Sequence, residues 1–108
     1  MKDRMDRWAD PPLLVLASLA SGPKHGYAIT QDVDSTMGFR LSAGTLYAVL
    51  ARLESDGLIE PLAAEDRRRP YRITPAGAAA LADQTVRMQR VTALASDRLR
   101  TSIGWAGA

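Results

Sequence analysis

The sequence predicts a mainly α-helical fold with a small β component (α+β). Three short segments with helical periodicity come first, two short apolar runs separated by a polar loop follow, and an alanine-rich segment completes the 108 residues. This length suits one domain, and 46% apolar residues can build its core. The order helix, helix, helix, hairpin, helix is typical of a winged helix-turn-helix. We therefore expect a winged-helix domain at residues 1–74 and a C-terminal helix at residues 75–108, both parts of one compact unit.

The first two helices are expected at about residues 10–21 and 26–37. Asp10, followed by two prolines, is a good N-cap for the first helix, and Gly38 is a good stop for the second. The apolar side of the first helix consists of Leu13, Leu14, Leu16 and Leu19. One face of the second helix carries Ile29, Val33 and Met37. We expect these apolar faces to pack together, with the segment SGPKHG forming the turn between the helices.

The third helix is expected at about residues 42–56, and a hairpin wing at about residues 58–74. Ser42 is a good N-cap, and Gly57 follows the helix. The buried face of this helix consists of Leu46, Val49, Leu50 and Leu53. After it, two short apolar runs flank the polar segment AAEDRRR, which has no helical period. This pattern predicts a two-stranded wing.

A long final helix begins after Thr74, which is a good N-cap, with Pro75 in the first helical position. The alanine-rich segment that follows has high helix propensity. One stripe of this helix carries Leu81, Met88, Val91, Ala95 and Leu99. Because a helix of this length has more apolar surface than one small core can cover, we expect it to be a dimerisation helix.

Two tryptophans lie outside the positions that a small core needs. Trp8 is near the N-terminus, and Trp105 is near the end of the last helix. Exposed tryptophan on a monomer is unusual, so we expect both side chains to be buried at a contact. The contact is either packing between two subunits without a ligand, or an interface between subunits that also holds a small ligand.

Composition excludes several classes of function. Cysteine is absent and there is one histidine, so a thiolate or multi-histidine metal site and a Cys/His pair cannot be built. A glycine-rich phosphate loop is also absent. We therefore expect no enzyme activity, no metal and no cofactor. The longest apolar run is too short to cross a bilayer, and the first ten residues do not resemble a signal peptide, so we expect a cytoplasmic protein without membrane contact.

Three stretches of the sequence occur in a recognisable order: LLVLASLASGPKHGYAI, LSAGTLYAVLARLESDGLIE and RRRPYRITPAGAAAL. In this order and spacing they resemble the signature stretches of PadR-type transcriptional regulators, over roughly residues 12–82. The resemblance implies a sequence-specific DNA-binding protein. The single last helix is similar to that of the compact PadR subgroup, in which this helix pairs across a two-fold axis and some members bind small apolar or aromatic ligands between subunits. Ala48 departs from the pattern, because the family commonly has proline there.

In a winged helix the third helix enters the DNA major groove, and here its outward face is small, with Gly44, Ala48, Ala51 and Ser55. Small residues allow close approach but offer few hydrogen bonds to bases, so specificity should depend partly on DNA shape. Hydroxyls and free amides at the helix start favour phosphate. The candidate DNA contacts here are Ser42, Ala43, Gly44, Thr45 and Tyr47. The alternative is that Ser42 only caps the helix and Tyr47 only packs.

The wing loop and the first turn supply the other candidates. Arg67, Arg68 and Arg69 are placed to meet phosphate or a narrow minor groove, or else they belong to a solvated turn balanced by adjacent acids. Three residues of the turn, Lys24, His25 and Tyr27, are candidate phosphate contacts. For His25 we favour the alternative of closing the turn through backbone hydrogen bonds.

The residues and the resemblance together predict a regulator that binds double-stranded DNA as a homodimer. We expect it to recognise an inverted repeat and to repress transcription by occluding a promoter, with a small apolar or aromatic effector able to relieve repression. The alternative function is a winged-helix module that binds a protein partner through the same helix and wing.

Overall fold

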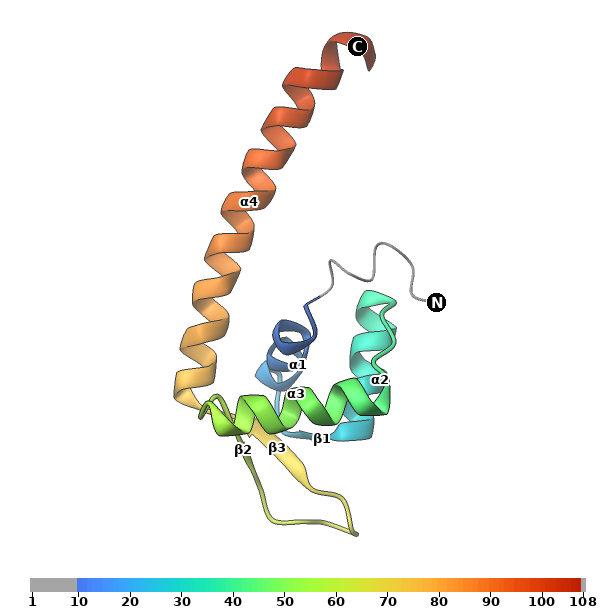
Figure 1. Ribbon diagram of the computed structural model, residues 1–108, viewed down its shortest axis with the longest axis vertical. Coiled ribbons are helices and arrows are strands. Elements are labelled where there is room, and N and C mark those ends of the chain that lie inside the picture. Colours follow the sequence, from blue (N-terminus) through green and yellow to red (C-terminus); the bar gives the residue numbers. More distant parts are fainter. Residues whose placement is uncertain (1–9, 108) are drawn as a thin grey trace.

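Three helices form the body of the protein (Figure 1). The computed structural model describes residues 10–107, with side chains as far as residue 102. Helix α1 spans Pro11–Ala20, α2 spans Gly26–Met37 and α3 spans Ala43–Ser55. Each helix begins and ends within one residue of its predicted range. Helix α1 contacts both α2 and α3, which confirms the predicted packing of the first two helices.

Each of these helices begins at a side chain that satisfies a free backbone amide. Asp10, His25 and Ser42 each accept a hydrogen bond from the amide three residues later, over 3.2 to 3.4 Å. Such N-caps offset the unpaired donors of the first helical turn. The expected caps Asp10 and Ser42 are therefore confirmed. At the other end of α2, Gly38 adopts the left-handed conformation with φ of 66°, as its role of stop requires.

The core lies where the three helices meet. Its buried side chains are Val15, Leu16, Leu19, Ile29, Val33, Leu41, Leu46, Val49, Leu50, Leu53 and Ile59. Two expectations about it are wrong. Met37 is 64% exposed and is the last residue of α2, where the buried face of that helix has already ended. On α1, which is covered on several sides, Val15 is fully buried whereas Leu13 is only half-buried.

The wing belongs to a sheet of three strands rather than two. Strands β2 (Ile59–Pro61) and β3 (Pro70–Ile73) form the predicted hairpin, and β1 (Lys24–His25) pairs with the other edge of β3. All pairings are antiparallel. The predicted turn between α1 and α2 therefore contains a short strand. This pairing fixes the base of the wing to the start of α2.

Helix α4 (Pro75–Gly107) follows the sheet directly. Its first turns contact α1 and β3, and the rest extends away from the body (Figure 1). Thr74 caps it as predicted, since its Oγ1 accepts the Gly77 amide over 3.0 Å. Leu81 is half-buried and packs against the core of its own subunit, so it is not part of the exposed apolar stripe of α4. Among the described residues, no helix is both long and apolar enough to span a membrane.

Candidate nucleic-acid interface

The outward face of α3 is the flat, small-residue surface that the helical wheel predicts. Gly44, Ala48, Ala51 and Ser55 are exposed, whereas the opposite face is buried in the core. A Cβ atom added to Gly44 would have no heavy atom within 4 Å, so the space outside this position is open. The predicted buried and outward faces of α3 are therefore confirmed, while the entry of the outward face into a DNA groove stays a prediction. Its backbone can approach another surface closely along this face.

Hydroxyl groups surround the N-terminus of α3. Ser42 Oγ accepts the Thr45 amide over 3.2 Å and donates to Thr45 Oγ1 over 2.9 Å. Both hydrogen bonds are exposed, so the two hydroxyls remain accessible to a ligand. Ala43 lies beside them and is also exposed. Capping by Ser42 is thus established, while its contact with DNA stays a prediction.

Two tyrosines stand on the same side of the molecule. Tyr27 on α2 is 63% exposed and Tyr47 on α3 is 59% exposed, so neither side chain belongs to the core. Gly26 brings their helices together, because a Cβ atom there would lie 3.3 Å from Tyr47 Oη. Gly26 was missed at the level of sequence, where it reads only as part of a turn. The absence of a side chain lets the start of α2 approach α3 closely.

The wing tip is a tight two-residue turn. Asp66 and Arg67 have φ of 48° and 66°, and the backbones of Glu65 and Arg68 exchange two hydrogen bonds of 2.7 and 2.8 Å. Two consecutive left-handed residues are the mark of a type I′ turn, which matches the twist of a hairpin but favours asparagine or glycine. An arginine in this position costs conformational energy. The turn holds Arg67 at the apex of the wing.

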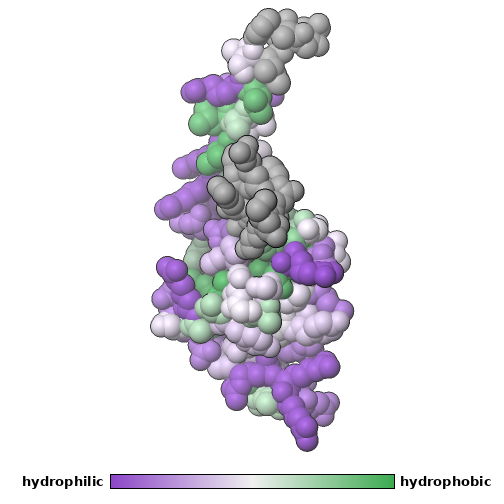
Figure 2. Space-filling view, turned by 45° about the vertical axis from the view of Figure 1, so that its right-hand side comes forward, coloured by the Kyte–Doolittle hydropathy of each residue, from purple (hydrophilic) through white to green (hydrophobic). Residues whose placement is uncertain are grey.

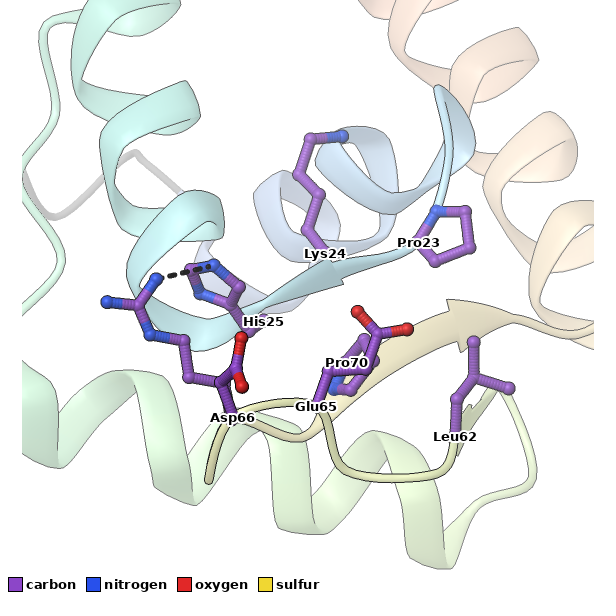
Figure 3. A pocket seen from close by; sticks show the side chains of 8 residues that line it. Pro23, Lys24, His25, Leu62, Glu65, Asp66 and Pro70 are labelled. Atoms are coloured by element: carbon purple, nitrogen blue, oxygen red, sulfur yellow. Dashed lines mark hydrogen bonds between the residues drawn. The ribbon is translucent and has the colours of Figure 1, made fainter.

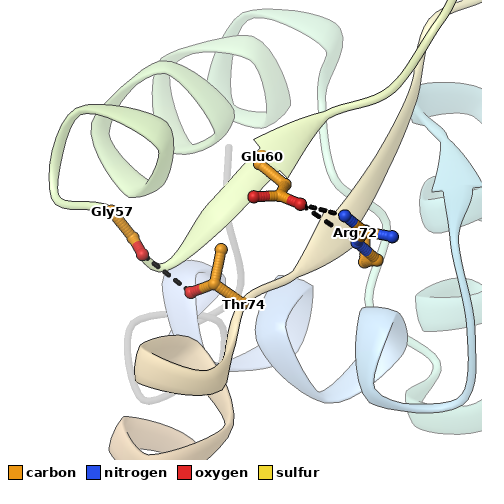
Figure 4. A network of polar contacts seen from close by, with 4 residues as sticks. All are labelled: Gly57, Glu60, Arg72 and Thr74. Carbon is orange, nitrogen blue, oxygen red and sulfur yellow. Dashed lines mark hydrogen bonds and ion pairs between the residues drawn. The ribbon is translucent and has the colours of Figure 1, made fainter.

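The wing arginines carry unneutralised positive charge. Arg67, Arg68 and Arg69 are all exposed, and in the described part of the chain no carboxylate lies within ion-pair distance of them. At the base of the wing, by contrast, Arg72 forms an ion pair with Glu60 on the neighbouring strand (Figure 4). The interpretation of the triplet as a turn balanced by the adjacent acids is therefore not supported by the geometry.

His25 connects the wing to the helical body. Its Nδ1 accepts the Ala28 amide, and its Nε2 lies 3.4 Å from Arg68 Nη1 (Figure 3). The structural role that we favoured for this histidine is thus present. Lys24 points the other way, toward α1, where its ammonium donates to the Ser18 carbonyl and to Ser21 Oγ. Its engagement at the end of α1 argues against the predicted phosphate contact.

Two hollows flank the wing. One, of about 700 Å³, lies between β1 and the wing loop and includes the carboxylates of Glu65 and Asp66 (Figure 3). The other, of about 390 Å³, lies between the start of α2, the side of α3 and the wing. Its wall contains three tyrosines, three arginines and His25, but no carboxylate: Tyr27, Tyr47, Tyr71 and Arg67, Arg68, Arg69. This second hollow is suited to an anion.

The predicted dimer surface lies on the opposite end of the molecule. Met88, Val91 and Leu99 on α4 are 51%, 64% and 54% exposed, and Ala95 between them is exposed too. Figure 2 shows apolar side chains next to polar ones along the extended part of α4, and mainly polar ones at the wing end. Trp8 lies outside the described residues, and so does the side chain of Trp105. An apolar stripe thus remains on α4 after its own core is complete.

Sequence reasoning missed three features of this region. The strand Lys24–His25 has only two residues, too few to show a period. Tyr71 lines the hollow between α3 and the wing, although β3 was predicted only as a strand. Gly77 is buried at the start of α4, where an added Cβ would lie 2.0 Å from the Leu58 carbonyl oxygen. A glycine inside an alanine-rich helix start is the signal that could have identified this close approach.

Comparison with known proteins agrees with the geometry. A protein of 37.1 kDa in transposon TN4556 of Streptomyces fradiae is 44% identical over 86 residues, which cover 80% of this chain and 25% of that protein. The chain therefore spans about a quarter of that relative. Transcriptional regulator Rv3488 of Mycobacterium tuberculosis is 47% identical over 74 residues, covering 66% of this chain and 68% of that protein.

The fold and a family model agree as well. A PadR family transcription regulator from Clostridium difficile, 24% identical, superimposes with a TM-score of 0.76 over 82% of this chain and 97% of that one, which shows a shared fold. The model of the transcriptional regulator PadR-like family matches residues 15–83, more than half of the chain. Its members are transcriptional regulators rather than enzymes. The chain belongs to the PadR-like family of transcriptional regulators.

Proposed function

We propose that this DNA-binding regulator represses transcription as a homodimer on an inverted-repeat operator. The observation that carries the proposal is the exposed small-residue face of α3 beside a wing whose three arginines have no carboxylate partner among the described residues. A helix of small side chains fits the major groove, and unpaired guanidinium groups bind phosphate. Occupying a promoter in this way blocks its use. A regulator of this kind works in the cytoplasm, beside the DNA.

The exposed stripe of α4 supports the homodimer. Met88, Val91 and Leu99 would be covered by the same stripe of a second copy, as a two-fold axis requires. A two-fold dimer would place two α3 helices in successive major grooves, so half-sites should lie about 34–36 Å apart. The stripe and the tryptophans Trp8 and Trp105 would then belong to one interface.

A small apolar or aromatic effector is the final part of the proposal. An apolar hollow of about 410 Å³ lies where α4 leaves the body, lined among others by Ala20, Ile73, Leu81 and Ala82. Because α4 carries the dimer surface, a ligand at this junction would change the angle between the two DNA-binding units. Effector binding there would therefore misalign the half-sites.

A gel mobility shift with the DNA that flanks the coding sequence, at two salt concentrations, tests the proposal. We expect a retarded complex whose affinity falls steeply with salt, because each phosphate contact releases counterions. Footprinting of that complex should show two symmetric protected half-sites. A protein-binding module that uses the same helix and wing gives neither result, since its contacts do not depend on counterion release.

A further inference from the structure

The imidazole ring of His25 takes part in two contacts that it cannot satisfy together. Nδ1 accepts the Ala28 amide over 3.4 Å, and Nε2 lies 3.4 Å from Arg68 Nη1. A neutral imidazole has one acceptor nitrogen, and a guanidinium group has only donors. When Nδ1 caps α2, Nε2 therefore carries a hydrogen and faces a second donor. Two donors meet with no acceptor between them.

On the side of this pair that faces α3, the surroundings contain more positive charge and no carboxylate. The hollow of about 390 Å³ beside Nε2 is lined by three arginines of the wing and by the hydroxyl-bearing rings of Tyr27 and Tyr47. The carboxylates of the wing, Glu65 and Asp66, line the other hollow, on the opposite side of the same two residues, and neither forms an ion pair with Arg68 within the described residues. An anion is the ligand that satisfies converging N–H donors at such a place.

We infer that His25 Nε2–H and the Arg68 guanidinium together bind one phosphate group of the DNA backbone. The inference rests on the proposed function, because the hollow opens between the start of α2, the face of α3 and the wing. In this arrangement His25 keeps its Nδ1 on the Ala28 amide and donates from Nε2, and Arg68 turns from the ring to the same phosphate oxygens. The N-cap of α2 thus holds the His25 ring in the tautomer and orientation that the phosphate contact needs. Through this contact the wing and the start of α2 bind the same phosphate group.

Two substitutions of His25 separate its two nitrogens. In His25→Asn the side-chain oxygen replaces Nδ1 and keeps the N-cap, because asparagine is among the best capping residues, but no donor reaches the position of Nε2. In His25→Gln the amide nitrogen reaches that position, and the cap is lost. Arg68→Ala removes the charged partner, and Arg87→Ala on α4 is the matched charge control, since Arg87 pairs with Asp83 far from the hollow.

The measurement is fluorescence anisotropy with a mixed-sequence duplex of about three helical turns, since phosphate contacts do not depend on sequence. We expect His25→Asn to lower affinity about tenfold, with its thermal midpoint unchanged, because the variant no longer makes a hydrogen bond to a charged group. The slope of log affinity against log salt should not change, since a neutral ring releases no counterion. His25→Gln should keep the affinity and lower the thermal midpoint by several degrees.

Arg68→Ala should lower affinity and make the salt slope shallower by about 0.9, whereas Arg87→Ala should change neither. In the Arg68→Ala background, His25→Asn should lower the affinity much less than tenfold, because the two groups hold the same phosphate.

Wild-type affinity in His25→Asn overturns the inference. A shallower salt slope in that variant overturns it too, because it would mean that His25 binds the phosphate as a cation. A third result also overturns the inference: millimolar inorganic phosphate raises the thermal midpoint of the wild type, but His25→Asn binds DNA as tightly as the wild type does. The hollow would then bind a small free anion and not the DNA backbone. Failure of the wild-type protein to bind any duplex would instead overturn the proposed function.

Discussion

Thr74 Oγ1 donates a hydrogen bond of 2.7 Å to the Gly57 carbonyl, and so joins the turn after α3 to the residue that precedes α4 (Figure 4). The same oxygen accepts the Gly77 amide over 3.0 Å and caps α4. The Thr74 amide donates to the Leu58 carbonyl over 3.0 Å. One residue therefore fixes the direction of α4 relative to α3. In a dimer built on α4, this direction sets the distance between the two α3 helices.

Thr74→Val should lower the free energy of unfolding by about 1–2 kcal/mol, because it removes the cap of α4 and the bond to Gly57 while keeping the shape of the side chain. Urea unfolding monitored by circular dichroism measures this. Thr74→Ser is the control, since it retains the hydroxyl, and it should lie close to wild type. Equal stability of the valine variant would show that water replaces both hydrogen bonds at no cost.

Gly77→Ala should destabilise the protein by about 1–3 kcal/mol, although alanine is the better helix former. The added Cβ would lie 2.0 Å from the Leu58 carbonyl oxygen and 2.8 Å from Ile73 Cγ1, so α4 must move away from the sheet. Gly44→Ala is the control, because a Cβ there has open space and should stabilise α3 by up to about 0.5–1 kcal/mol. Thermal or urea unfolding should therefore show a lower free energy of unfolding for Gly77→Ala and a higher one for Gly44→Ala, relative to the wild type.

Most of the helical frame could be predicted because its signals are local. Asp10, Ser42 and Thr74 cap the helices that they were predicted to cap, and the periodicity of α3 identified its buried face. The strand Lys24–His25 could not be predicted, because its two residues are held only by pairing with β3, a partner distant in sequence. The exposure of Met37 could not be predicted either, because this residue follows the apolar period of α2 although the core ends before it.

The candidate site was predicted by residue type but not by arrangement. The arginine triplet and the outward face of α3 follow from sequence position alone. The approach of Arg68 to His25 does not, because these residues are 43 positions apart and meet through the wing fold. The opposite orientation of Lys24 also depends on tertiary structure, since the end of α1 supplies its acceptors.

Replacing Arg67, Arg68 and Arg69 with alanine should weaken binding to specific and nonspecific DNA alike, because phosphates are the same at every sequence. The slope of log affinity against log salt should become shallower by about 0.9 for each phosphate that the variant no longer neutralises. Titrations of a duplex at several salt concentrations measure both quantities. An unchanged slope and affinity would return these arginines to the role of a solvated turn.

Val91→Asp should dissociate the homodimer, because it places a charge in the middle of the exposed stripe of α4, where Val91 is 64% exposed in one copy. Analytical ultracentrifugation should show about twice the mass of 11.7 kDa for the wild type and 11.7 kDa for the variant at micromolar concentration. Arg90→Asp, one position away, is the control for added negative charge and should remain a dimer. A wild-type species of 11.7 kDa alone would contradict the proposed dimer.

Gly44→Leu should leave the fold intact or slightly more stable, while sharply reducing affinity for the operator. Nothing lies within 4 Å of a Cβ at this position, and glycine in a helix costs up to about 0.5–1 kcal/mol relative to alanine, so stability alone favours a larger residue even at the second position of α3. Close approach to the groove floor is the reason to keep glycine there, since a leucine side chain would hold the first turn of α3 away from the base edges.

Ser55→Leu is the matched control for Gly44→Leu, because Ser55 is also exposed on the outward face but at the far end of α3. The N-terminal residues of a recognition helix contact the bases, so this second variant should bind close to normally. Circular dichroism measures whether each variant is folded, and the gel mobility shift measures its affinity for the operator. Unfolding of Gly44→Leu would assign Gly44 to internal packing. Normal operator binding by that variant would mean that another face of α3, or none, enters the groove.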